Sequence, residues 1–223
     1  MRIETVTYHV YKYNELSEDA KQKAKDDYLS DDHRPYLFNR DLEWYLEDLF
    51  GTGNDMNLGC KFGGSNSMKV QFSLGYCQGD GLNIYGNVYA EDIFKALAKS
   101  DNYPILEEYA DVMTDAEKDT ILYYAGICND IELPRNDRYC YCMADYIDFA
   151  DDWRDSLEWE DYENIDVVTI HKFENLVQDI FSALCRQFEE WGYKYFYEIS
   201  DEEMEEMCEA NELEFYENGK LFC

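Results

Sequence analysis

Residues 167–199 read VVTIHKFENLVQDIFSALCRQFEEWGYKYFYEI, a long apolar periodicity near the end of the 223-residue sequence. Large apolar side chains recur every three or four positions in this stretch, at Phe173, Leu176, Val177, Ile180, Phe181, Leu184, Phe188 and Trp191. This spacing matches the 3.6-residue period of an α-helix. It therefore predicts one long amphipathic helix over residues 167–199.

Shorter helices are expected on both sides of this segment. Ser17, Thr114 and Ser200 are each followed by acidic residues, a pattern typical of a helix N-cap and first turn. The expected helices cover residues 18–29, 36–50, 91–99, 115–126 and 201–210.

Runs rich in β-branched and aromatic residues, separated by glycine-rich turns, predict strands. These runs are residues 2–13, 57–62, 67–76, 82–89 and 137–148, and Asn218-Gly219 predicts a final hairpin. Helices and strands do not alternate regularly, so we predict an α+β fold. Its antiparallel meander sheet packs with several helices, including a long C-terminal helix. A single domain over residues 1–223 is expected, with residues 145–223 as an alternative acidic C-terminal subdomain.

The composition combines strong negative charge with enough apolar material for a core. The chain has 50 Asp and Glu against 19 Lys and Arg, a formal net charge of −31, and it is 46% hydrophobic. Such a chain is expected to fold rather than remain disordered. Its shortage of basic residues argues against direct binding of nucleic acid or anionic membranes.

The compartment is also an expectation from the sequence. The start MRIETVTYHVYKY lacks a signal-peptide pattern, and no apolar run reaches the roughly 18 residues of a membrane span. We therefore expect a cytoplasmic protein with no membrane partner. Its eight cysteines, none in a C-x-x-C pair, are interpreted as reduced and buried. The alternative is a zinc site built from scattered Cys and His9, His33 or His171.

The acidic residues are segregated along the chain. Residues 145–166 contain ten acids against Arg154 alone, and residues 189–217 contain twelve acids against Lys194 alone. Residues 56–90, by contrast, contain a single acidic residue, Asp80. Self-repulsion of this kind lowers folded stability. A chain that keeps it is expected either to use the negative field or to live where salt screens it.

A row of carboxylates on a helix resembles a nucleic-acid strand in its charge spacing. Positions i and i+4 are separated by about 6 Å along the helix axis, and phosphates on one DNA strand by about 3.4 Å. A basic groove that binds nucleic acid is therefore expected to bind such a row. Aromatic residues among the acids suit anchors inside a polar rim, although Trp153 is expected in the core.

The predicted partner-binding residues come from both acidic clusters. They are Asp148, Asp151, Asp152, Asp155, Glu158, Trp159, Glu160, Asp161, Tyr162, Glu163, Glu202, Glu203, Glu205, Glu206 and Glu209. Two alternatives attach no partner to these acids: a coat that only solvates the surface, and adaptation to high salt.

Catalytic and cofactor motifs give no comparable signal. Carboxylate pairs are too abundant to single out an acid/base couple, and Asp145, Asp148 and Asp151 lack the spacing of a calcium loop. The residues Gln78-Gly79-Asp80-Gly81 are explained as a hairpin turn, with a ligand loop as the alternative. No catalytic residue, metal or cofactor is predicted.

Two stretches, YNELSEDAKQKA at residues 13–24 and FSLGYCQGDG at residues 72–81, carry recognisable motifs. The first is similar to the ELS-x-x-A-K-x-K-A opening, and the second to the downstream F-S-x-x-x-x-Q-G-D-G run, of a group of small phage and prophage proteins. The resemblance covers roughly residues 10–90 and carries over no catalytic residue. It implies a phage protein acting in a host bacterial cell, in a group sometimes labelled antitoxin-like.

Three functions are weighed on these grounds. The first is a non-enzymatic anti-defence inhibitor that blocks the nucleic-acid groove of a host effector by imitating DNA. A CRISPR nuclease is the first candidate effector and a restriction enzyme the second. The second is an antitoxin or regulatory protein that neutralises a basic partner. The third is an enzyme using paired carboxylates.

Overall fold

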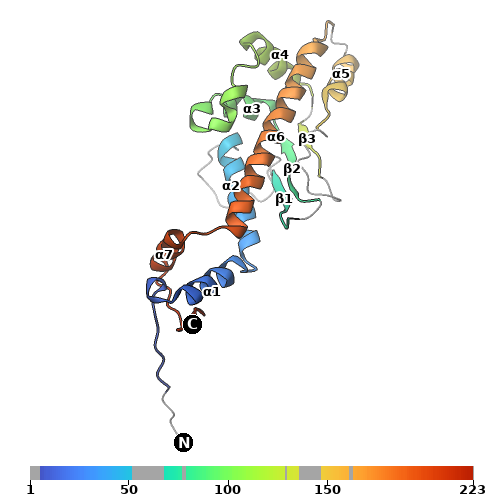
Figure 1. Cartoon of the computed structure of the whole chain (residues 1–223). Coiled ribbons are helices and arrows are strands. Elements are labelled where there is room, and N and C mark those ends of the chain that lie inside the picture. The colour runs from blue at the N-terminus through green and yellow to red at the C-terminus, as the bar shows by residue number, and fades with distance from the viewer. Residues whose placement is uncertain are drawn as a thin grey trace, which may run out of the picture. The chain divides into compact units, whose positions relative to one another are not determined.

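The computed structural model describes residues 6–51, 68–76, 79–128, 130–135, 147–160 and 163–222 (Figure 1). The chain divides into two compact units. One comprises Met1–Phe38 with Gly192–Cys223, which we call the terminal unit, and the other is Asn39–Trp191, which we call the central unit.

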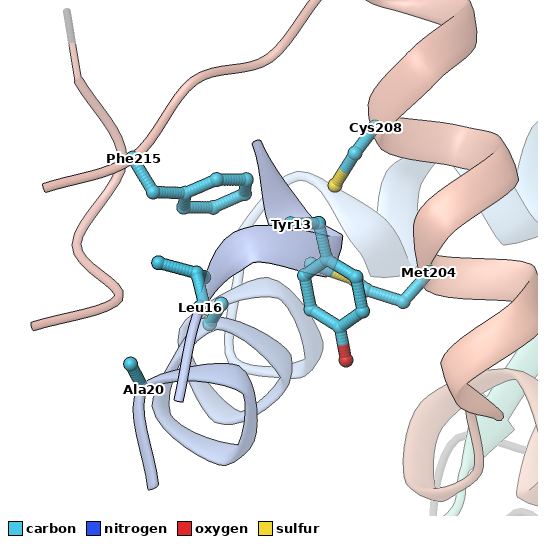
Figure 2. Packing of buried hydrophobic residues seen from close by; sticks show 7 residues of the cluster. Tyr13, Leu16, Ala20, Met204, Cys208 and Phe215 are labelled. Carbon is cyan, nitrogen blue, oxygen red and sulfur yellow. The ribbon is translucent and has the colours of Figure 1, made fainter. Parts of the chain in front are cut away.

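The terminal unit is built around a small apolar cluster shared by helices from the two ends of the chain. Its elements are the 3₁₀ helix η1 (Tyr13–Glu15), α1 (Glu18–Leu29) and α7 (Asp201–Ala210). The buried cluster consists of Tyr13, Leu16, Ala20, Ala24, Met204, Cys208 and Phe215. Figure 2 shows Met204 and Cys208 of α7 pointing toward the rings of Tyr13 and Phe215.

The predicted caps of this unit are confirmed. The Ser17 side chain accepts a hydrogen bond from the Ala20 amide at the start of α1, and Ser200 accepts one from the Glu203 amide at the start of α7. Both helices end where the sequence predicts.

The strand predicted over residues 2–13 is wrong in its described part. Residues 6–10 form no strand, Tyr11 makes one isolated bridge with Phe215, and η1 follows two residues later. β-Propensity without a neighbouring strand to pair with does not form a sheet. The predicted C-terminal turn is present, and Phe215 also bridges Leu221 across it.

Arg34 is a buried cation that joins α1 to the ends of α2 (Arg34–Phe50) and α6 (Val167–Tyr197). Its guanidinium lies 4.3 Å from the ring centre of Tyr28 and 4.1 Å from that of Tyr195, and it donates a hydrogen bond to the Tyr195 carbonyl. Cation–π contacts and the negative end of the α6 dipole both stabilise a positive charge at this position.

Gly219 generates a prediction about the terminal unit. Its φ is +81°, and a Cβ there would lie 2.0 Å from the Ala20 carbonyl oxygen. Gly219→Ala is expected to destabilise this unit by at least about 2 kcal/mol, because the left-handed conformation alone costs about 1–2 kcal/mol and α1 must also shift. The loss of stability is measured by urea unfolding, with hydrogen exchange of the α1 amides as the probe of the terminal unit.

The matched control is Gly126→Ala, where no positive φ is present and the added Cβ is 3.3 Å from the Tyr123 carbonyl. If both substitutions change stability equally, the close packing of the turn on α1 is not important.

The central unit contains the sheet, and the α+β class with an antiparallel meander is confirmed. Strands β1 (Lys69–Ser73), β2 (Gly81–Val88) and β3 (Ile131–Leu133) pair antiparallel in the order β1-β2-β3. Val70 lies opposite Ile84, and Val88 lies opposite Ile131. The strand predicted over 57–62 lies outside the described residues. So do residues 137–146 of the strand predicted over 137–148, and its last two residues, 147 and 148, are not in a strand.

The remaining elements of this unit are helical. They are α3 (Ala90–Leu97), η2 (Ser100–Asn102), η3 (Pro104–Tyr109), α4 (Asp115–Ala125) and α5 (Ala150–Trp159), beside parts of α2 and α6. The helices expected over 36–50, 91–99, 115–126 and 167–199 are confirmed, while η2, η3, α5 and β3 were not predicted.

The long helix α6 supplies the central line of this core. Phe173 contacts Phe94 of α3 at 5.2 Å between ring centres and Trp153 of α5 at 6.1 Å. Phe181 stacks on Phe50 of α2 at 5.3 Å. The predicted apolar face therefore gathers α2, α3 and α5.

An ion pair links α4 to α6. Lys172 Nζ lies 2.7 Å from Glu117 Oε1, and the Thr114 amide and hydroxyl also donate to this carboxylate. The Lys172 hydrogen bond, followed by those from Thr114, lowers the pKa of Glu117 to about 2. The ionised form stabilises the fold above pH 4.5, and this contribution is lost as the pH falls toward 2.

Lys172→Met is expected to raise the pKa of Glu117 toward its ordinary 4.5, while the Thr114 hydrogen bonds keep it below that value. A carboxyl ¹³C NMR titration measures it, with Lys118→Met, at a surface pair of 4.0 Å, as control. An unchanged midpoint in Lys172→Met would contradict the link.

Candidate functional site

The outer face of α7 presents a row of carboxylates. Met204 and Cys208 are buried, while Glu202, Glu206 and Glu209 are exposed. Residues four and three apart lie on one side of a helix, so these three glutamates form a row opposite the buried pair. Among the described residues, their carboxylates have no hydrogen-bond or ion-pair partner. The row is therefore exposed and unpaired within the described part of the chain.

The other acids of α7 serve the fold. Asp201 lies 2.7 Å from Lys25 Nζ and accepts a hydrogen bond of 2.7 Å from the Tyr13 hydroxyl, and these contacts lower the pKa of Asp201. Glu203 completes the capping box with Ser200, and the hydrogen bonds from Ser200 lower the pKa of the Glu203 carboxyl group. The Glu205 carboxylate accepts a hydrogen bond of 2.7 Å from the side-chain amide of Asn14. The contacts of Asp201 and Glu205 fix α7 to residues 13–25, whereas the Glu203 contact caps α7 itself.

A groove of about 720 Å³ adjoins this row within the terminal unit. Tyr13, Cys208 and Leu213 supply its apolar surface. Glu205, Glu209, Glu212 and Glu214 contribute carboxylates, and Lys12 and Asn14 complete the lining. Long cationic side chains lay their aliphatic stems on apolar surface and keep their charged heads among polar groups. The groove matches that chemistry.

The second acidic cluster lies on α5 of the central unit. Ala150, Trp153 and Leu157 are buried, and Trp153 is only 4% exposed, as the sequence predicts for a core residue. Asp151, Asp152, Asp155 and Glu158 are exposed, and so are Asp148, Glu160 and Glu163 beside the helix. Asp161 and Tyr162 lie outside the described residues.

The acids of α5 are partly neutralised by a cation on the same helix. Arg154 lies 2.6 Å from Asp151, 2.9 Å from Asp155 and 3.8 Å from Glu158. Hydrogen bonding to Asp155 and the charge of Asp151 raise the pKa of Arg154. The field of α5 is therefore weaker than its count of acids indicates.

Trp159 is the most exposed large apolar residue of the described chain, at 86%. It follows Asp155 by four positions and Asp152 by seven, so all three share one helix face. An indole ring flanked by carboxylates fits the predicted anchor among acids.

The start of α5 is held by a side chain from α6. The buried Glu174 carboxylate accepts hydrogen bonds of 2.7 Å from the amides of both Phe149 and Ala150. α5 has no N-cap hydrogen bond from its own N-cap residue, Phe149. Glu174 therefore positions the acidic face of α5.

Glu174→Ala is expected to destabilise α5 by about 1 kcal/mol, the usual cost of losing a cap. Hydrogen exchange should show faster amides in α5, with α7 unchanged and the exposed neighbour Asn175→Ala as control. Unchanged exchange in α5 would contradict the capping role.

Sequence reasoning missed part of the groove. Tyr13 precedes its partner Asp201 by 188 residues, and Asn14 precedes Glu205 by 191. No local pattern connects residues so distant in the chain. The two predicted clusters belong to different units, so each is a surface of its own unit.

Metal and thiol chemistry find little support in the described part of the chain. No group of three or more His, Cys, Asp or Glu there has the arrangement of a metal site. Burial raises the pKa of the Cys128 and Cys208 thiols to about 11, which keeps both protonated and weakly nucleophilic at neutral pH.

No known family model, curated protein or solved structure matches the chain. Among the described helices, none has both the length and the apolar character needed to span a membrane.

Proposed function

We propose that this protein binds the cationic surface of a nucleic-acid-binding protein through the α7 row and its groove, and thereby excludes nucleic acid. The observation that carries the proposal is the row Glu202, Glu206 and Glu209, which is exposed, unpaired among the described residues and placed beside further carboxylates. No described residue neutralises these three charges, which favours their use in binding.

Electrostatics supports a basic partner. A net charge of −31 attracts cationic surfaces at long range and accelerates their association. A channel lined with Arg and Lys for nucleic acid is the surface that such a row fits best. The charge of the chain equally disfavours nucleic acid itself as a ligand.

The resemblance to small phage proteins supports the biological setting of the proposal. In that setting the partner is a host defence effector in the bacterial cytoplasm, with a CRISPR nuclease as first candidate and a restriction enzyme as second. The protein acts as an inhibitor, not as an enzyme.

The structure changes the order of the two clusters in this proposal. On sequence grounds residues 145–166 come first. Arg154 lies near three acids there and offsets part of their charge, whereas no cation of the described residues pairs with the α7 row, so we assign α7 the primary role and α5 a secondary one.

The antitoxin alternative has the same electrostatic basis and is separated by copurification. An antitoxin retains one small cognate protein, whereas an effector inhibitor retains a large nucleic-acid-binding one. The enzyme alternative is separated by neutralising acidic pairs one at a time. An enzyme loses its activity when one particular carboxylate pair is replaced, whereas binding by a charged face weakens gradually over many substitutions.

The test compares two triple variants that remove the same number of charges. Glu202→Gln/Glu206→Gln/Glu209→Gln neutralises the α7 row, and Asp101→Asn/Glu107→Gln/Asp119→Asn neutralises exposed acids of the central unit. Binding of each full-length variant to an immobilised nona-arginine peptide is measured across a range of salt concentrations.

The α7 variant is expected to bind about tenfold more weakly at low salt and to show a smaller salt dependence, because each exposed pair contributes about 0.2–1 kcal/mol. The control variant should remain close to the unmodified protein. Equal losses in both variants would show that only total charge matters, and salt-independent affinity would refute the electrostatic mechanism.

A further inference from the structure

A second pocket, of about 240 Å³, lies among α3, α4 and α5 of the central unit. Its lining includes Tyr89 and Glu91 from the start of α3, Leu122 and Gly126 from the end of α4, Asp130, and Trp153 of α5. The volume is below the roughly 300–1,000 Å³ of pockets for drug-sized molecules. It suits a single long side chain.

The lining combines an apolar body with two carboxylates. Trp153 and Leu122 provide the apolar surface, and Trp153 is itself held in place by ring contacts with Phe149 at 5.0 Å and Phe173 at 6.1 Å. Glu91 and Asp130 provide negative charge. Aromatic faces and carboxylates both attract cations.

Neither carboxylate is tightly engaged. Glu91 lies 2.9 Å from Lys95, but both side chains are more than half exposed, and such pairs contribute little. Asp130 accepts a long hydrogen bond of 3.4 Å from the Asn87 amide. Both are available to an incoming cation at small cost.

The end of α4, which contributes Leu122 and Gly126 to the pocket lining, also carries exposed apolar side chains. Leu122, Tyr123 and Ile127 are exposed at 39%, 56% and 37%. Gly126 lies between them and contributes no side chain to the pocket. An apolar surround that excludes water strengthens a polar contact at its centre.

We infer that this pocket receives one arginine or lysine side chain from a partner protein. The aliphatic stem lies against Trp153 and Leu122, and the cationic head lies between Glu91 and Asp130. The inference rests on the proposed function for a basic partner, but it involves a different unit and different residues.

A second copy of this chain is a poor source of that side chain. Two chains of −31 repel each other. Many cations of the described residues are already engaged, as in the pairs of Lys25 with Asp201, Lys69 with Glu43, and Lys172 with Glu117. A basic protein offers unpaired cations instead.

The test uses two small probes of nearly equal shape on the full chain. Nα-acetyl-arginine methylamide carries the charge, and Nα-acetyl-citrulline methylamide is its neutral counterpart. The protein is labelled with 5-fluorotryptophan, and ¹⁹F NMR follows its four tryptophans. The arginine probe is expected to shift the Trp153 signal saturably, at least about fivefold more tightly than the citrulline probe, with little change at exposed Trp159.

Two variants locate the binding. Gly126→Leu fills the pocket and should abolish the Trp153 shift, and Glu91→Gln/Asp130→Asn should reduce arginine binding to the citrulline level. Glu107→Gln/Asp119→Asn removes two exposed acids elsewhere in the unit and should leave binding unchanged. Folding of each variant is checked by its thermal unfolding midpoint.

Equal binding of the two probes, or an undiminished shift in Gly126→Leu, would overturn the inference. Failure of the proposed function is recognised separately, because neutralising the α7 row should leave probe binding at this pocket intact. Unchanged nona-arginine binding by that α7 variant would refute the proposed function and not the pocket.

Discussion

Carboxylates must remain in water or find a partner, because burying an unpaired charge costs far more than one apolar contact returns. With 50 acids in the chain, this constraint shapes each acid-rich helix. α7 buries Met204 and Cys208, and α5 buries Trp153 and Leu157, so their acids lie on the opposite faces. Two acids of the described residues are buried: Glu174, with two backbone amides as donors, and Asp92, which lies 3.6 Å from Lys95.

The two acidic helices then differ in how their charge is balanced. On α5, Arg154 sits among its acids and leaves a mixed surface with an exposed indole. On α7, Asp201 and Glu205 are paired with residues near the N-terminus, and the outer-face acids have no partner within the described ranges. The same contacts that fold the terminal unit therefore orient the α7 row outward. Asp201 and Glu203, which stabilise the fold, are thus distinct from the row Glu202, Glu206 and Glu209 that we propose for binding.

Much of the fold follows from local sequence signals. The Ser17, Thr114 and Ser200 caps and the apolar period of α6 were sufficient to predict four helices, because capping and amphipathicity act within a few residues. α5 escaped prediction because its cap comes from Glu174, about 25 residues away. The strand expected over residues 2–13 failed in its described part, residues 6–13, because Tyr11 alone finds a bridging partner there.

The candidate site also has a part that local sequence predicts and a part that only the tertiary structure reveals. The acids of α7 were predicted from charge alone, and their outward direction followed once the helix was assigned. The groove beside them needs Lys12, Tyr13 and Asn14, which only the tertiary fold brings to α7. The cancelling role of Arg154 depends on its side-chain geometry and was likewise not predictable from composition.

Competition with nucleic acid tests the central claim most directly. The full chain is immobilised, a bacterial lysate is passed over it at low salt, and the retained proteins are challenged with excess duplex DNA at constant ionic strength. If the acidic surface imitates nucleic acid, nucleic-acid-binding proteins are retained and excess DNA releases them. This is expected because DNA and the acidic surface compete for one basic surface of the partner. Retained proteins that stay bound in excess DNA would contradict it.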